Sequence, residues 1–306
     1  MIGIVILNYN SWEETTRCIE SVFDNPPQED YRIYCVDNGS SSPMLDGFGT
    51  QYDQRRFFLI CTGKNLGYAA GNNVGIKRAL NDGCDMILIS NNDIVFYENT
   101  IAQMATYLKE YPHVGIVGPR VVDRNGNTQK GCMCIKTGMK EKYLLRTRFH
   151  ILFPGYNARY WGLNYDYDHD SFPVHAVSGC CFMMSAACAR DVTPLDEGTF
   201  LYEEEFILGT VMEQKGWKTM YVPASTVLHL HGASTRYVKV FAYTCNVRSE
   251  IYYCRKYLHA SRISILGLYL YRVGIYALHC LKLREYRKGF GKFVKDTAGY
   301  AWGPHA

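Results

Sequence analysis

Short apolar segments rich in β-branched residues, separated by amphipathic ones, most restrict how this chain of 306 residues can fold. Each apolar segment has the length of a buried strand. In the segments between them, apolar residues recur with the period of a helix. In chain order we expect strands at Ile2–Leu7, Ile33–Val36, Phe57–Ile60, Met86–Ile89 and Val114–Val117, with helices ending near Phe23, near Leu80 and near Tyr111. Strands that alternate with helices predict an α/β fold with a mostly parallel sheet.

Two local patterns refine these elements. Ser11 and Glu14 have the spacing of a capping box, which predicts the start of the first helix. The segment Gly63–Gly71 is rich in glycine and asparagine, which predicts a loop before the second helix. After Arg120 the periodicity weakens. There we expect a strand at Val174–Ser185, a helix at Glu203–Lys215, and two short strands at Thr219–Val222 and Thr226–Leu230.

Polar clusters follow three of the predicted strands at the point where each strand ends. They are Asn8-Tyr9-Asn10, Asp37-Asn38-Gly39-Ser40 and Asn91-Asn92-Asp93. In open α/β sheets, ligands bind beyond the carboxyl ends of the strands. We therefore expect the three clusters to converge on one crevice.

Two carboxylates in these clusters are candidates for ligand binding. Asp93 suits a hard cation that takes its other ligands from phosphates, although an N-cap or turn residue is the alternative. Asp37 could accept hydrogen bonds from the N–H groups of a nucleobase, or it could be an Asx-turn residue before Gly39.

Three acidic residues and two histidines complete the candidate site. The crowded carboxylates Glu203-Glu204-Glu205 open a predicted helix, where they either favour the helix dipole or raise one another's pKa and supply a general base. His229 and His231 lie on the same face of a strand, so that one of them could join Asp93 at a metal ion. A structural histidine is the alternative for either. Lys64 and Arg120 are candidates for phosphate or base contacts.

The charge of the chain is unevenly distributed. Residues 241–306 hold 11 Lys/Arg and three Asp/Glu, a balance of +8, whereas the rest of the chain has a balance of −4. This region begins with a predicted aromatic helix, Phe241–Tyr257. The apolar segment Ile263–Leu283 follows and has Arg272 at its centre, which opposes a transmembrane span. A helix packed on the body or lying in a bilayer interface is favoured, with an ordinary solvated basic face as the alternative.

The 12 cysteines do not indicate a disulfide framework. Cys18, Cys35, Cys61 and Cys84 fall in apolar periodic segments, where cysteine behaves as a small hydrophobic residue. No Cys-x-x-Cys motif and no secretory signal are visible, so we expect a reducing cytoplasm and no zinc site.

The segments together resemble family 2 glycosyltransferases, especially rhamnosyltransferase-like and capsular-polysaccharide members. In the first half the matching strings are Val5-Ile6-Leu7-Asn8-Tyr9-Asn10, Val36-Asp37-Asn38-Gly39-Ser40, Gly63-Lys64-Asn65-Leu66-Gly67-Tyr68-Ala69-Ala70-Gly71-Asn72-Asn73, Ser90-Asn91-Asn92-Asp93 and Gly115-Ile116-Val117-Gly118-Pro119. In the second half they are Ser178-Gly179-Cys180-Cys181-Phe182-Met183, Leu195-Asp196-Glu197, Phe200-Leu201-Tyr202-Glu203-Glu204-Glu205, Gly216-Trp217 and His229-Leu230-His231-Gly232-Ala233-Ser234-Thr235. The order and spacing hold from residue 2 to about residue 257.

The resemblance implies a GT-A fold, a Rossmann-like sheet with flanking helices, and a nucleotide-diphospho-sugar donor bound with Mg²⁺ or Mn²⁺. It implies that Asp93 binds the metal with His229 or His231, and that Glu205, with Glu204 as its rival, is the base of an inverting single displacement. The residues expected to bind the donor are Asn8, Asp37, Lys64, Asn65, Gly67, Asn73, Asn91 and Asn92.

We therefore expect a hexosyltransferase that moves rhamnose from dTDP-rhamnose, or a hexose from a UDP-sugar, to a growing glycan or lipid-linked glycan. Residues 1–240 would form the catalytic domain, with a donor half at 1–120 and an acceptor half at 121–240, and residues 241–306 a helical appendage. The chain would be cytoplasmic, with its basic end at the anionic inner face of the cell membrane and no nucleic-acid partner. The alternatives are a catalytically silent nucleotide-sugar-binding scaffold and a nucleotidyltransferase.

Overall fold

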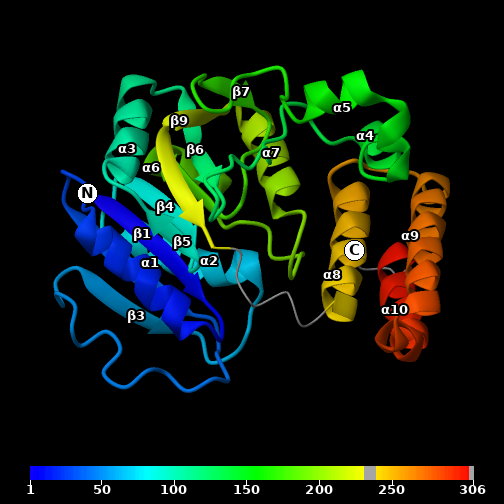
Figure 1. Ribbon diagram of the computed structural model, residues 1–306, viewed down its shortest axis with the longest axis horizontal. Coiled ribbons are helices and arrows are strands. Elements are labelled where there is room, and N and C mark those ends of the chain that lie inside the picture. Colours follow the sequence, from blue (N-terminus) through cyan, green and yellow to red (C-terminus); the bar gives the residue numbers. More distant parts are fainter. Residues whose placement is uncertain (231–238, 303–306) are drawn as a thin grey trace.

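The structure is a computed structural model that describes residues 1–230 and 239–302. A mixed sheet lies at the centre of the molecule (Figure 1). Within these residues the sheet has nine strands in the order β3-β2-β1-β4-β8-β6-β9-β5, with β7 beside β9. Its first four strands are parallel to one another: β1 (Ile2–Asn8), β2 (Tyr31–Asp37), β3 (Phe57–Cys61) and β4 (Met86–Asn91). The predicted α/β fold with a mostly parallel sheet is confirmed.

The second half of the sheet differs from the expectation. Its strands are β5 (Ile94–Phe96), β6 (Val114–Val122), β7 (Phe172–Val174), β8 (Cys181–Ser185) and β9 (Lys218–His229). The single strand predicted at Val174–Ser185 is wrong, because β7 pairs with β9 whereas β8 crosses to pair antiparallel with β4 and β6. The two strands predicted within residues 219–230 are one strand, whose pairing with β6 shifts register after Pro119.

Helices cover both faces of the sheet. On one face, α1 (Trp12–Asp24) and α3 (Thr100–Glu110) bury Ile19 and Met104 against the sheet. On the other face lie α2 (Tyr68–Asn81), α6 (Ala186–Val192) and α7 (Glu204–Lys215), and these bury Ile76, Cys188 and Met212.

Helix α1 begins at Trp12 with Ser11 as its N-cap, as predicted, but the side chain of Ser11 makes no capping hydrogen bond. Its carbonyl oxygen accepts from the backbone N–H of Thr15 at 3.0 Å. The predicted start of the second helix is wrong. Helix α2 begins at Tyr68, inside the segment expected to be a loop through Gly71. Glycine lets this helix approach the sheet, since a Cβ at Gly75 would lie 2.4 Å from Cγ1 of Val5.

The remaining helices form the side of the molecule away from β1–β3 (Figure 1). They are α4 (Met139–Leu144), the 3₁₀-helix η1 (Arg148–Leu152), α5 (Pro154–Tyr160), α8 (Lys239–Lys256), α9 (Arg262–Lys282) and α10 (Arg284–Trp302). Tyr253 of α8 packs in one buried cluster with Phe206 of α7 and Tyr160 of α5. The division at residue 240 stays a prediction, but α8 shares a core with the preceding half.

The cysteines are all unpaired, and all of them lie in the described residues. Most are buried, and burial raises the pKa of the Cys18 thiol to about 12. Among the described helices, α9 has the length and composition of a segment that could cross a membrane.

Candidate active site

The buried amide of Asn8 joins the three strand ends that the sequence placed together. Its Nδ2 donates to Oδ1 of Asp37 and to Oγ of Ser40, both at 3.2 Å. Its Oδ1 accepts from Oγ1 of Thr15 at 2.9 Å and from Nδ2 of Asn92 at 3.4 Å. The strand register places Asn8 opposite Asp37 and Leu7 opposite Asn91, so the expected convergence on one edge of the sheet is confirmed.

Asp37 lies at the end of β2 and is buried. Its Oδ1 also accepts from the backbone N–H of Ser40 at 3.2 Å, which closes the turn after the strand. Gly39 in this turn has φ +71, and a Cβ there would lie 2.3 Å from the backbone carbon of Lys64. The turn that follows Asp37 is therefore packed directly on the loop that carries Lys64, whose side chain is exposed.

The loop before α2 is held by amide contacts. Nδ2 of Asn38 donates to Oδ1 of Asn65 at 3.2 Å and to the carbonyl oxygen of Gly67 at 3.0 Å. Gly67 has φ +87, and a Cβ at this position would lie 2.5 Å from the carbonyl oxygen of Phe200. Only glycine fits, and the close approach brings this loop against the segment that leads into α7.

Asp93 and His229 form the pair that could hold a metal ion. His229 is opposite Ile94 in the β5–β9 ladder, and its Nε2 lies 3.3 Å from Oδ2 of Asp93. A carboxylate oxygen and an imidazole nitrogen this close can bind one divalent cation. The described residues contain no group of three or more His, Cys, Asp or Glu side chains around a common point, and His231 lies outside them. The two residues fit a cation that receives its other ligands from phosphates and water.

Glu205 is joined to the strand-end cluster through two residues before β8. Its Oε1 accepts from the backbone N–H of Gly179 at 3.2 Å. The carbonyl oxygen of the next residue, Cys180, accepts from the backbone N–H of Asn91 at 2.8 Å. The hydroxyl of Tyr68, the first residue of α2, donates to the carbonyl oxygen of Gly179. Glu205 thus lies beside both the Asn91 strand end and the loop before α2.

Glu204 and Glu205 both border an apolar cavity of about 250 Å³ between α2, α6 and α7, which His175 also lines. Burial, together with the charge of Glu205, raises the pKa of Glu204 to about 8. Burial lowers the pKa of His175 to about 4. At neutral pH, Glu204 is therefore mostly protonated and His175 is neutral.

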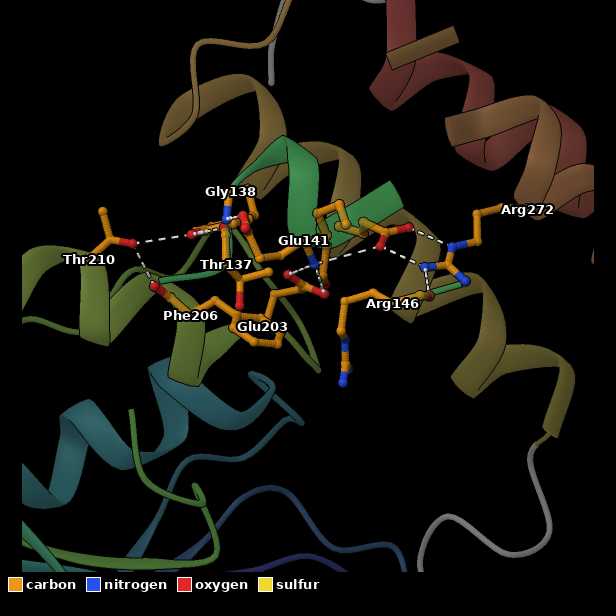
Figure 2. A network of polar contacts seen from close by, with 12 residues as sticks. Thr137, Gly138, Glu141, Arg146, Glu203, Phe206, Thr210 and Arg272 are labelled. Carbon is orange, nitrogen blue, oxygen red and sulfur yellow. Dashed lines mark hydrogen bonds and ion pairs between the residues drawn. The ribbon is translucent and has the colours of Figure 1, made fainter. Parts of the chain in front are cut away.

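Glu203, the third acidic residue of the run, belongs to a buried ion cluster that sequence reasoning missed (Figure 2). Nζ of Lys142 lies 2.7 and 2.5 Å from the two carboxylate oxygens of Glu203 and 3.6 Å from Oε1 of Glu250. Arg272 binds both oxygens of Glu250, each at 2.7 Å. We call Lys142, Glu203, Glu250 and Arg272 the ion cluster.

The ion cluster balances two positive against two negative charges and joins α4, α8 and α9 to the start of α7. Burial lowers the pKa of Lys142, but Glu203 and Glu250 outweigh it, and the net change is upward. Burial raises the pKa of Glu250, but Lys142 and Arg272 outweigh it, and the net change is downward. Both groups therefore stay charged. No sequence signal identified this cluster, because its members are far apart in the chain.

The ion cluster holds a strained turn beside Glu204 and Glu205. Tyr202 and Glu203 both adopt left-handed backbone conformations, with φ of 75° and 73°. Such a conformation costs about 1–3 kcal/mol in a residue other than glycine and persists only where the surroundings hold it. Lys142 supplies that hold at Glu203, and the turn sets the direction in which α7 presents its first carboxylates.

Three predicted donor-site residues make contacts within the protein. Nδ2 of Asn73 donates to the carbonyl oxygen of Leu195 and to Oε1 of Glu197, both at 2.9 Å, so it joins α2 to the loop before α7. Nδ2 of Asn92 donates to Oγ1 of Thr15 at 2.9 Å. Asn92 and Asn8 together organise the strand ends. Nη2 of Arg120 lies 2.8 Å from Oδ1 of Asp168.

This geometry agrees with comparisons to known proteins. The model of glycosyl transferase family 2 matches residues 3–186, more than half of the chain, and the chain belongs to this family. The N-acetylglucosaminyl-diphospho-decaprenol L-rhamnosyltransferase of Mycobacterium tuberculosis is 25% identical over 247 residues, which are 77% of this chain and 78% of that protein. The low-salt glycan biosynthesis hexosyltransferase Agl10 of Haloferax volcanii is 26% identical over 211 residues, which are 67% of this chain and 59% of that protein.

Solved structures show the same GT-A fold. S. aureus TarS 1-349 in complex with UDP-GlcNAc matches with a TM-score of 0.57 at 11% identity, over 98% of this chain and 81% of that one. GalNAc-T7 with UDP, GalNAc and Mn²⁺ matches with a TM-score of 0.56 at 14% identity. That match covers 99% of this chain, which spans 58% of the GalNAc-T7 chain.

The first prediction concerns Lys142. Lys142→Met leaves Glu203 without its buried counterion, and breaking a buried pair in this way costs about 3–5 kcal/mol. We expect the free energy of unfolding, measured by chemical denaturation, to fall by that amount. Lys140→Met is the matched control, because Lys140 is exposed on the same helix. Equal losses in the two variants would contradict the role given to the ion cluster.

The second prediction concerns the titration of Glu204. The folded-state pKa of Glu204, about 8, is higher than the value of 4.5 for a free glutamate side chain. Glu204 therefore contributes stability that is fully present below pH 4.5 and is lost as pH rises to about 8. We expect Glu204→Gln to remove this loss of stability. The loss amounts to about 1.4 kcal/mol for each pH unit between the unfolded and folded pKa values. In denaturation experiments, the free energy of unfolding of the variant should equal that of the wild type near pH 5 and exceed it near pH 8.

Glu213→Gln, near the exposed end of the same helix, is the control for that comparison. A Glu204→Gln profile that runs parallel to the wild-type profile from pH 5 to pH 8 would show that Glu204 ionises normally.

Proposed function

We propose that this family 2 glycosyltransferase binds a nucleotide-diphospho-sugar at the strand ends and transfers the sugar with inversion to a hydroxyl of a growing glycan. The observation that carries the proposal is the path of contacts from Asn91 through Cys180 and Gly179 to Glu205. It places a carboxylate beside the strand ends at which Asp37 and Asp93 lie. A donor that spans Asp37 and Asp93 would leave its sugar on the side of Glu205.

The donor half of the proposal assigns roles to named groups. Asp37 would accept from the nucleobase, and Lys64, Asn65 and Gly67 would border the nucleotide along the loop before α2. Asn91 would contact the ribose. A divalent metal held by Asp93 and His229 would, when bound, stabilise the negative charge of the leaving diphosphate.

The catalytic half of the proposal distinguishes Glu205 from Glu204. Glu205 would take the proton of the acceptor hydroxyl as that oxygen bonds to the anomeric carbon and the bond to the diphosphate breaks. The pKa of Glu204 is about 8, so this carboxyl must first lose a proton before it could accept one. The N–H of Gly179 orients the Glu205 carboxylate, which supports Glu205 as the base.

The relatives support a substrate class. The mycobacterial relative is a rhamnosyltransferase that acts on a decaprenol-linked sugar, and dTDP-rhamnosyl transferase RfbF of Shigella flexneri is 25% identical over 142 residues. We infer dTDP-rhamnose as the first donor to test, UDP-hexoses as the second, and a lipid-linked glycan as the acceptor. The charge of residues 241–306 supports a cytoplasmic chain attached peripherally to the inner face of the cell membrane.

Of the alternatives, a nucleotidyltransferase receives no support from the family to which the chain belongs. A catalytically silent scaffold remains as an outcome of experiment. Slow release of free sugar and nucleoside diphosphate from the donor, measured without acceptor, distinguishes an enzyme from a scaffold.

The third prediction concerns metal-dependent binding. Asp93→Ala removes one of the two proposed protein ligands, and we expect it to abolish the gain in UDP or dTDP affinity that Mn²⁺ produces in titration calorimetry. Asp85→Ala is the control, because Asp85 lies just before β4, at the opposite end of that strand. Unchanged Mn²⁺-dependent affinity in Asp93→Ala would remove Asp93 from the metal site.

The fourth prediction concerns the base. Glu205→Gln keeps the shape of the side chain but cannot take a proton, so we expect turnover to fall at least 100-fold. Donor affinity should stay within about twofold, because the donor contacts are unchanged. Turnover with dTDP-rhamnose or the UDP-hexose that proves active is the readout, and Glu213→Gln is the matched control. Near-wild-type turnover in Glu205→Gln would show that Glu205 is not the base.

A further inference from the structure

The solvent-facing side of α9 is apolar along its whole length. Its exposed positions recur every three or four residues, which places them on one face of the helix. Between Arg262 at its first residue and Lys282 at its last, they are Ile263, Leu266, Gly267, Leu270, Gly274, Ala277, Leu278 and Leu281. We call these eight residues the α9 stripe. Ile263 is 83% exposed and Leu281 is 78% exposed, values unusual for large apolar side chains.

A second group of exposed apolar side chains borders the α9 stripe. The backbone N–H of Arg148, the first residue of η1, donates to the hydroxyl of Tyr271 of α9 at 3.0 Å. The residues that follow Arg148 include Ile151, 71% exposed, and Leu152, 66% exposed. Phe149 and Phe153 beside them are also exposed. The start of η1 is therefore held against α9, and its exposed apolar side chains add to those of the α9 stripe.

The opposite side of α9 is fixed to the protein. Arg272, near the middle of the helix, is part of the ion cluster, and its Nη2 also donates to the carbonyl oxygen of Arg146 at 3.0 Å. Tyr269 and Tyr276 are buried against α10. A helix that crossed a bilayer would lose these contacts and would carry Arg272 into hydrocarbon. One face of the helix is therefore packed on the protein, and only the opposite face is available to contact a surface.

The charges around the surface favour an anionic partner. Helix α9 contains no Asp or Glu, and cations flank the α9 stripe at both ends. Helix α10 adds exposed basic side chains at Arg284, Arg287, Lys288, Lys292 and Lys295. Two copies of this chain meeting through the same face would bring two regions of charge +8 together, which opposes self-association.

We propose that the α9 stripe and the exposed residues of η1 form a membrane-docking surface that inserts into the interface of a bilayer rich in anionic lipid. The apolar side chains enter the boundary between headgroups and acyl chains, and the surrounding Lys and Arg side chains contact the phosphates. This surface lies outside the proposed donor and catalytic residues, so the inference does not depend on the identity of the sugar.

Flotation of the full chain with liposomes tests the inference. The wild type should bind vesicles of phosphatidylcholine with 30% phosphatidylglycerol and bind pure phosphatidylcholine vesicles at least tenfold more weakly. The double variant Leu270→Glu/Leu281→Glu should lose at least tenfold in partition onto the anionic vesicles, and Ile151→Glu/Leu152→Glu should lose a comparable amount. Met44→Glu/Leu45→Glu is the matched control, because these two exposed apolar residues lie on the α/β side of the molecule and should not affect binding.

Thermal melts of each variant establish that the chain is folded, and calorimetric binding of UDP or dTDP establishes that the donor site is intact. Vesicle binding by folded Leu270→Glu/Leu281→Glu equal to that of the wild type would overturn the proposal. So would a wild type that sediments as a dimer and does not float, with the same double variant monomeric. Either result leaves the proposed transfer reaction standing, because donor binding and turnover are measured separately.

Discussion

The buried amide of Asn8 is the contact on which the site depends. An amide can donate and accept at once, and this one donates to the end of β2 while it accepts from α1 and from the residue after β4. A buried amide without partners would cost free energy, so these bonds make the relative positions of three strand ends part of the stability of the core. Asp37 and Asp93 are held at the edge of the sheet because the amides between them are satisfied within the protein.

Three consecutive glutamates at the start of α7 illustrate how environment divides the roles of identical side chains. Glu203 is paired with Lys142 within the ion cluster, and burial next to Glu205 raises the pKa of Glu204 to about 8. Glu205 is oriented by the N–H of Gly179. Three neighbouring negative charges would repel one another, and the fold avoids this by a counterion at the first residue and a proton at the second.

The sequence was sufficient to predict what rests on local pattern. The strands β1–β4, the helices between them and the meeting of Asn8, Asp37 and Asn91 follow from hydrophobic period and from the rule that parallel strands end at one edge. It was insufficient where distant segments decide the structure. The split of residues 174–185 between β7 and β8 depends on which neighbours each pairs with. Lys142, Glu203, Glu250 and Arg272 have no shared motif, and the inward amides of Asn73 and Asn92 cannot be told from ligand contacts by residue type.

The ion cluster also has a geometric consequence for the proposed catalyst. Arg272 projects from the inner side of the same helix whose outer side carries the α9 stripe, and the cluster ends one residue before Glu204. Packing and ion pairs therefore connect the proposed bilayer contact to the proposed base. With the stripe on a membrane, these contacts would fix the height of Glu205 above the bilayer. In that case, an acceptor hydroxyl would have to reach the same height above the membrane to meet Glu205.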